Sequence, residues 1–130
     1  MTIAELCLPG AVLLYILTIG LAKASDRKGF DNGDPRDPAF YASGFRKRAL
    51  GAQNNGIETF PLFAAAVLLA EMRHAPQGVI DGLAVGFIVV RVAYVAAYLG
   101  DKPTVRSTLW TLGFALTLAI FFMPLWARGG

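Results

Sequence analysis

Three polar side chains that could do chemistry, Arg48, Asn55 and Glu58, lie at i, i+7 and i+10 in the apolar stretch 48–63. At helical spacing these positions share one face, which Leu62 continues as an apolar position. Charged and amide groups at membrane depth are costly unless they find a partner or a water-filled cavity. The stretch therefore predicts either polar contacts that hold helices together or a polar site on the first half of a helix.

A further charged residue, Arg91, lies inside a later apolar segment. Counted from the same side at 1.5 Å per residue, Arg91 is roughly 12 Å deep and Glu58 roughly 14 Å deep. Either residue alone would carry several kcal/mol of desolvation cost. The equal depth and opposite charge predict a structural ion pair between Glu58 and Arg91.

Two tyrosines, Tyr94 and Tyr98, follow Arg91 on the same helical face, and Arg106 and Ser107 begin the next apolar segment at the same level. Singly, an arginine or tyrosine at such a level is typical of an anchor at the membrane interface. Together with the polar stripe of 48–63, they predict a polar cavity between the second, third and fourth segments.

The chemistry that such a cavity favours is binding of an anion or a thiolate. Arginine keeps its charge and can fork onto carboxylates, and a guanidinium beside a thiol raises its thiolate fraction. A Ser-His-Asp set, a phosphate loop and a metal cluster are absent from the sequence. The lone Cys7 cannot form an intrachain disulfide, and the single His74 reads as a solvated loop residue.

These residues need helices to position them. The chain has 130 residues, 55% of them hydrophobic. The apolar residues form four segments without a polar face, each near the ~20 residues that cross a bilayer as a helix. The sequence thus predicts one domain, 1–130, that is an all-α, integral membrane bundle of four transmembrane helices. The predicted spans are about 6–22, 49–72, 79–99 and 108–127.

Basic residues concentrate in the predicted loop 23–47 and in the turn 101–106, whereas only Arg73 and Arg128 lie on the other side. Because cytoplasmic loops are enriched in lysine and arginine, both basic loops are predicted to be cytoplasmic and both termini non-cytoplasmic. The first segment lacks a basic start and a cleavage site, so it is predicted to be a retained span. The net charge of +3 gathers near span ends and predicts no nucleic-acid partner.

The sequences RALGAQNNGIETFPLF (48–63) and RVAYVAAYLGDKPTVRSTLW (91–110) closely resemble the MAPEG family, the membrane-associated proteins in eicosanoid and glutathione metabolism. The resemblance covers essentially the whole chain and identifies it as a bacterial-type member. It implies a homotrimer in the bacterial inner membrane, with glutathione bound between subunits near the cytoplasmic face. It also implies glutathione transfer to lipophilic electrophiles, or reduction of lipid hydroperoxides.

By position, the resemblance assigns thiol activation to Arg106, with Ser107 beside it. Asn55 and Glu58 match residues that hold the glutathione backbone and amino end, and Tyr98 matches a tyrosine of the glutathione pocket. The remaining matched glutathione-binding positions are Tyr94 and Arg48. No metal is implied; the expected partners are membrane lipids and a lipophilic substrate.

Two other functions stay open. The family's enzymes best known for tight glutathione binding carry an arginine where this chain has Gly51, and its prostaglandin synthase carries another where this chain has Asn54. These departures favour a non-catalytic protein that binds a lipid or a partner protein. A small transporter with Glu58 as a proton-coupled site is the third hypothesis. The predicted pairing of Glu58 with Arg91 argues against it, because a neutralised glutamate does not easily cycle protons.

Overall fold

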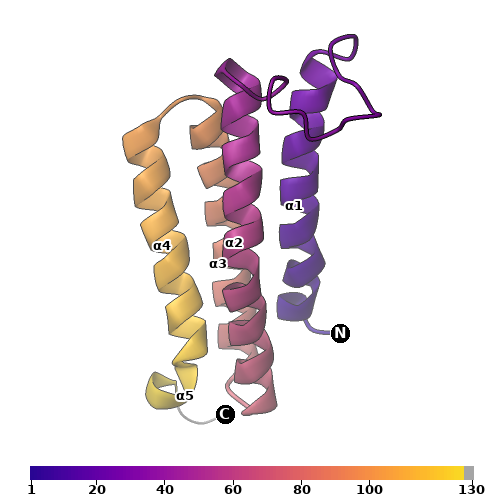
Figure 1. Cartoon of the computed structure of the whole chain (residues 1–130). Coiled ribbons are helices and arrows are strands. Elements are labelled where there is room, and N and C mark those ends of the chain that lie inside the picture. The colour runs from indigo at the N-terminus through magenta and orange to yellow at the C-terminus, as the bar shows by residue number, and fades with distance from the viewer. Residues whose placement is uncertain (128–130) are drawn as a thin grey trace.

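The computed structural model describes residues 1–127. They form four long helices that stand side by side (Figure 1) and one short helix. These are α1 (Ile3–Ser25), α2 (Gly44–Met72), α3 (Gln77–Leu99), α4 (Pro103–Phe121) and α5 (Met123–Trp126). All four long helices are apolar and long enough to cross a membrane. The predicted all-α architecture with four candidate spans is therefore confirmed.

The helices differ from the predicted spans mainly at their ends. The first three cover the predicted segments and extend beyond them; α2 is the longest, with 29 residues. The fourth predicted span, 108–127, is interrupted, because α4 ends at Phe121 and α5 begins at Met123. Pro124 accounts for this break: it has no N–H to continue a helix but fits the first turn of a new one. Arg128, which the orientation prediction used, lies outside the described residues.

Short turns and caps fix where the helices begin and end. Thr2 and Glu5 form a reciprocal capping box at the start of α1. His74 and Asp101 both have a φ of 57°, the left-handed conformation that ends a helix and reverses the chain. These residues let α2 connect to α3, and α3 to α4, through tight turns.

Two buried apolar clusters hold the bundle together, and small residues are common in both. The larger cluster lies toward the chain termini, where the rings of Phe63 and Phe87 stack with centroids 3.9 Å apart. The smaller one includes Ala22 and Ala49 at the opposite end. Alanines at these positions let helices approach closely. Arg91 is buried between the two clusters, on α3.

The loop 26–43 folds over the ends of α1 and α2 (Figure 1). Arg46 pairs with Asp26 at 3.0 Å, and its guanidinium lies 4.4 Å from the ring centroid of Phe40. Burial raises the pKa of Tyr41, whose hydroxyl donates to a backbone carbonyl in the loop. The loop is therefore an ordered segment that covers the ends of α1 and α2. We call the end of the bundle that carries this loop and the α3–α4 turn the loop end.

Candidate functional site

Arg91 is the most deeply buried charge of the candidate site, with 4% of its surface exposed. Its guanidinium donates a 2.8 Å hydrogen bond to Oδ1 of Asn55 on α2. Within residues 1–127 the one ion pair closer than 4 Å joins Arg46 and Asp26. The predicted Glu58–Arg91 ion pair is therefore not formed. Asn55 takes the place of the carboxylate because its amide oxygen reaches Arg91 from one turn nearer the loop end, while Glu58 is exposed.

Four side chains of α3 and α4 form a stacked series from Arg91 toward the loop end. The guanidinium of Arg91 lies 4.1 Å from the ring centroid of Tyr94. Tyr94 and Tyr98 meet edge to face at 5.8 Å, and Arg106 lies 4.7 Å from the ring centroid of Tyr98. Cations favour the faces of aromatic rings. The stacking therefore fixes both arginines on rigid rings and links the bundle centre to the start of α4.

The Arg48 side chain is hydrogen-bonded to the end of α3. Its Nε donates a 3.1 Å hydrogen bond to the carbonyl oxygen of Leu99, the last residue of that helix. A cation at a helix C-terminus satisfies a free carbonyl and complements the helix dipole. Arg48 thus ties α2 to α3 at the loop end, close along the chain to Gly51.

Gly51 lies against Tyr98 so closely that a Cβ would overlap the tyrosine hydroxyl and come within 2.7 Å of its Cζ. Absence of a side chain at this position is what lets the ring sit against the α2 backbone. The α2–α3 contact at the loop end therefore depends on the absence of a side chain at position 51.

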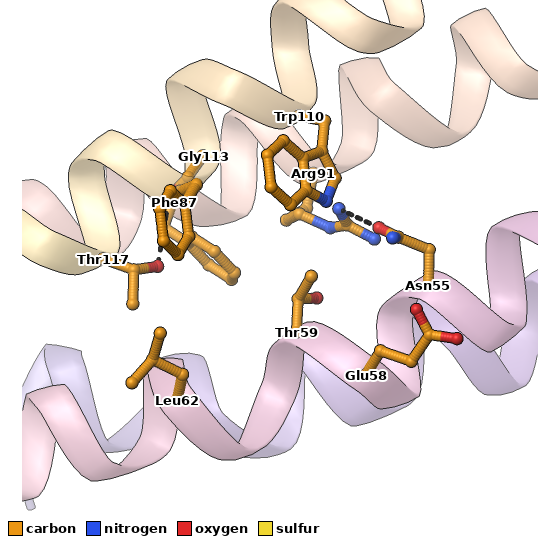
Figure 2. A pocket seen from close by; sticks show the side chains of 10 residues that line it. Asn55, Glu58, Thr59, Leu62, Phe87, Arg91, Trp110, Gly113 and Thr117 are labelled. Carbon is orange, nitrogen blue, oxygen red and sulfur yellow. Dashed lines mark hydrogen bonds between the residues drawn. The ribbon is translucent and has the colours of Figure 1, made fainter.

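A cavity of about 180 Å³ lies between α2, α3 and α4, where Figure 2 shows the side chains of the three helices converging. Arg91 and Asn55 form its polar wall, and Trp110 lines it from α4 (Figure 2). The full lining is Asn55, Glu58, Thr59, Leu62, Phe87, Arg91, Trp110, Gly113, Phe114 and Thr117. The cavity is polar toward the loop end and apolar toward the termini.

The structure brings most of the predicted site residues close together, but they do not all line one cavity. Asn55 and Glu58 line it, whereas Tyr94, Tyr98 and Arg106 connect to it through the stacked series. Ser107 is separate: it is exposed and lines a shallow hollow formed by α4 alone. A ligand contacting both Ser107 and the cavity would have to pass around α4.

Sequence reasoning missed several residues of the cavity wall. Thr59, Phe87 and Thr117 were not singled out. Helical spacing could have found Thr117, because positions 110, 113, 114 and 117 recur on one face of α4. The signal was weak since most of these residues are apolar and look like ordinary packing positions.

Basic charge also gathers at a second hollow, on the other side of α2. This cavity of about 590 Å³ lies beneath the loop 26–43 and includes Lys23, Arg36, Gln53 and Asn54. Its cations come from α1 and the loop, so they do not reach the Arg91 cavity within one chain. Residues 1–127 hold no group of three histidine, cysteine, aspartate or glutamate side chains that could bind a metal ion.

Comparison with protein families gives one result. The model of the MAPEG family matches residues 3–126, nearly the whole chain. A search of curated proteins finds no match.

Proposed function

Because the chain belongs to the MAPEG family, we propose that it is a membrane-bound, glutathione-dependent enzyme. It transfers glutathione to lipophilic electrophiles or uses glutathione to reduce lipid hydroperoxides. The main support for this proposal is the position of Arg106, which is half-buried and stacked on Tyr98 at the loop end. No acidic side chain within residues 1–127 pairs with it inside 4 Å, so its charge is available to a bound thiolate.

Arg106 stabilises the thiolate because a fixed cation beside sulfur favours the charged form. Tyr98 holds the guanidinium in place and its hydroxyl can donate to the same sulfur. Tyr94, one turn earlier in α3, packs edge to face against Tyr98. We expect the reactive sulfur to lie at the start of α4, between Arg106 and Tyr98.

The peptide part of glutathione requires groups of both signs. Glu58 offers a carboxylate to the amino group, Asn55 offers an amide, and Arg48 offers a guanidinium at the loop end. Glu58 and Ser107 are exposed in one chain, on α2 and α4. Their exposure supports a homotrimer, in which a second copy would cover these faces and complete each glutathione site.

Each reaction balances with glutathione as the only co-reactant. In conjugation, the thiol proton leaves to solvent, sulfur bonds to the electrophilic carbon, and the displaced electron pair goes to the acceptor oxygen or leaving group. In peroxide reduction, two glutathione molecules are oxidised to the disulfide while the hydroperoxide becomes an alcohol and water. The lipophilic partner in either case comes from the bilayer.

The loop end is proposed to face the cytoplasm of a bacterial inner membrane. This end of the bundle carries most of the basic residues of the chain, including Lys23, Arg36 and Lys102, and such basic ends stay on the cytoplasmic side. Both termini then lie outside. A water-soluble thiol in the cytoplasm would reach Arg106 directly.

The test is the ultraviolet absorbance of the thiolate when glutathione is added to the purified protein. Wild-type protein and Arg106→Lys should show it, and Arg106→Ala should lose it together with activity. Arg73→Ala, at the opposite end of the bundle, is the matched control and should behave as wild type. Thiolate absorbance and activity that survive in Arg106→Ala would refute the mechanism.

A second function, binding of a lipid or partner protein without catalysis, is favoured by Gly51. The Tyr98 hydroxyl fills the space of a side chain at that position, so an arginine-like contact to a glutathione carboxylate is missing there. A phospholipid that co-purifies with the protein, combined with no calorimetric signal for glutathione, would support this alternative.

A further inference from the structure

Arg91 is linked to α2 and to α4 from a buried position on α3. Its guanidinium donates a 2.8 Å hydrogen bond to Oδ1 of Asn55 on α2. It also lies 4.1 Å from the ring centroid of Tyr94, which leads through Tyr98 to Arg106 on α4. Because 4% of its surface is exposed, Arg91 has little room to move. One side chain therefore connects two groups that the proposed function uses.

The hydrogen bond from Arg91 determines which way the Asn55 amide faces. A guanidinium has N–H donors and no acceptor, so the amide must turn its oxygen toward it. Figure 2 shows the Asn55 oxygen at the end of this hydrogen bond. The NH₂ group is then what Asn55 can offer to a ligand, and this donor requires an acceptor such as a peptide carbonyl oxygen. The backbone of glutathione carries such oxygens.

The stacked series connects the position of Arg91 to that of Arg106. Tyr94 is 4% exposed and contacts the Arg91 guanidinium on one side and the Tyr98 ring on another. The Arg106 guanidinium lies 4.7 Å from the centroid of the Tyr98 ring. A cation over a ring is attracted to the ring face. Loss of the guanidinium beside Tyr94 would therefore free this ring to tilt, and the tilt would displace Tyr98 and Arg106.

Arg91 itself is too far from the expected position of the sulfur to act on it directly. At 1.5 Å per residue, Arg91 and Tyr98 are about 10 Å apart along α3. The sulfur is expected between Tyr98 and Arg106, so Arg91 can affect it through other side chains alone. Arginine suits this task because its planar guanidinium can stack on a ring and donate a hydrogen bond at once, which a lysine ammonium cannot do equally well.

We propose that Arg91 is a positioning residue that presets two parts of the glutathione site, the direction of the Asn55 amide and the position of Arg106 over the Tyr98 ring. This role rests on the proposed function, because both parts are assigned to glutathione there. The position of Arg106 can also be measured in protein without glutathione. A failure of the positioning role is therefore distinguishable from a failure of the proposed function.

Two variants of Arg91 separate its two contacts. Arg91→Lys keeps a side chain that can only donate, so Asn55 keeps its direction, but the planar group that stacks on Tyr94 is lost. Arg91→Gln also loses the stack, and its amide can donate or accept, so the direction of Asn55 is no longer fixed. Ile80→Ala is the control, because it removes packing from a fully buried position of the same helix outside the stacked series.

The first measurement needs no glutathione. NMR of protein with isotope-labelled arginine, in detergent, follows the Nε–H signal of Arg106, which is assigned by its loss in Arg106→Lys. The Tyr98 ring current shifts this signal, and Arg91→Lys should move it toward the value of an unstacked arginine. Ile80→Ala should lower the midpoint of thermal unfolding and leave the signal unchanged. An unchanged signal in Arg91→Lys, or an equal shift in Ile80→Ala, would overturn the positioning role.

The second measurement compares glutathione with S-methylglutathione, which has no ionisable thiol and reports binding of the peptide alone. Arg91→Lys should bind S-methylglutathione as the wild type does, whereas the pH at which half of the bound glutathione is thiolate should rise by about one unit. Arg91→Gln should show at least this rise and also bind S-methylglutathione up to about tenfold more weakly. Equal S-methylglutathione binding in the two variants would refute the effect on Asn55.

Tyr94→Leu tests the same connection if Arg91→Gln does not fold. It leaves the hydrogen bond between Arg91 and Asn55 in place and interrupts the stacked series, so the Arg106 signal should move as in Arg91→Lys. Adding Arg91→Lys to Tyr94→Leu should then move it no further. Additive shifts would show that Arg91 does not act through Tyr94. A moved Arg106 signal, in a protein whose wild type never forms the thiolate, would support the positioning of Arg106 and refute the proposed function.

Discussion

The hydroxyl of Tyr98 occupies the space that a side chain at Gly51 would need. The glycine lets the hydroxyl end of the ring rest on the α2 backbone, and the guanidinium of Arg106 lies 4.7 Å from the centroid of the same ring. A change at residue 51 is therefore transmitted to the arginine through one aromatic ring. This contact makes the glycine part of the candidate site although it offers no chemical group.

We expect Gly51→Ala to destabilise the protein, because its Cβ would displace Tyr98 in a packed region. Overpacking of this kind costs about 1–3 kcal/mol. Gly20→Ala is the matched control: it adds the same methyl group to a helix where nothing lies within 4 Å, and should be neutral or stabilising by up to ~1 kcal/mol. Thermal unfolding in detergent measures both. Equal stabilities would contradict the packing, whereas recovery in Gly51→Ala/Tyr98→Leu would support it.

Gly51→Arg should fail to improve glutathione binding, although it restores the arginine found in the family's glutathione-binding members. The new side chain has no room unless Tyr98 moves, and that movement would unseat Arg106. Isothermal titration calorimetry of the wild type and the variant in detergent would measure the outcome. A lower dissociation constant for glutathione in Gly51→Arg would contradict this prediction, because it would show that Tyr98 can move aside while the site still binds glutathione.

Asn55→Ala should destabilise the bundle more than Glu58→Gln. Asn55 accepts the hydrogen bond of buried Arg91, and leaving a buried charge without a partner costs roughly 1–3 kcal/mol or more. Glu58 is exposed and forms no ion pair with Arg91, so its neutralisation should have little effect on the midpoint of thermal unfolding. The opposite order of stability would restore the Glu58–Arg91 pair as the structural contact.

The ordered structure of the loop 26–43 should depend more on the packing of its aromatic side chains than on the ion pair between Asp26 and Arg46. The side chains of Asp26 and Arg46 are 45% and 31% exposed, and exposed pairs contribute 0 to ~1 kcal/mol, so Asp26→Asn should change little. Phe40→Ala removes a buried ring and should cost about 3 kcal/mol. Limited proteolysis of the loop should be fast in Phe40→Ala and near the wild-type rate in Asp26→Asn. Similar rates in the two variants would disprove this ranking.

Composition and hydrophobic pattern were enough to predict the fold. Four long apolar segments in one chain allow few arrangements, since helices are the form that satisfies the backbone within a membrane. The break before α5 was missed because a proline near the end of an apolar run is compatible with both a frayed end and a new helix. Pattern alone does not choose between them.

The candidate site was predicted in part. Helical spacing correctly grouped Tyr94 and Tyr98 on one face with Arg91, because such spacing follows from helix geometry. It could not rank two neighbouring partners for Arg91, since Asn55 and Glu58 lie one turn apart on the same face. Which of them reaches the guanidinium depends on rotation of α2 against α3, a property that one sequence does not contain.

The length of α2 has a consequence for how a ligand arrives. With 29 residues at 1.5 Å each, the helix is ~43 Å long, against ~30 Å of hydrocarbon in a typical bilayer. An upright α2 therefore projects into the headgroup layer by about two turns, and its polar first turns, around Arg48, favour the loop end for that projection. A charged, water-soluble molecule could therefore contact these first turns of α2 without entering the hydrocarbon of the bilayer.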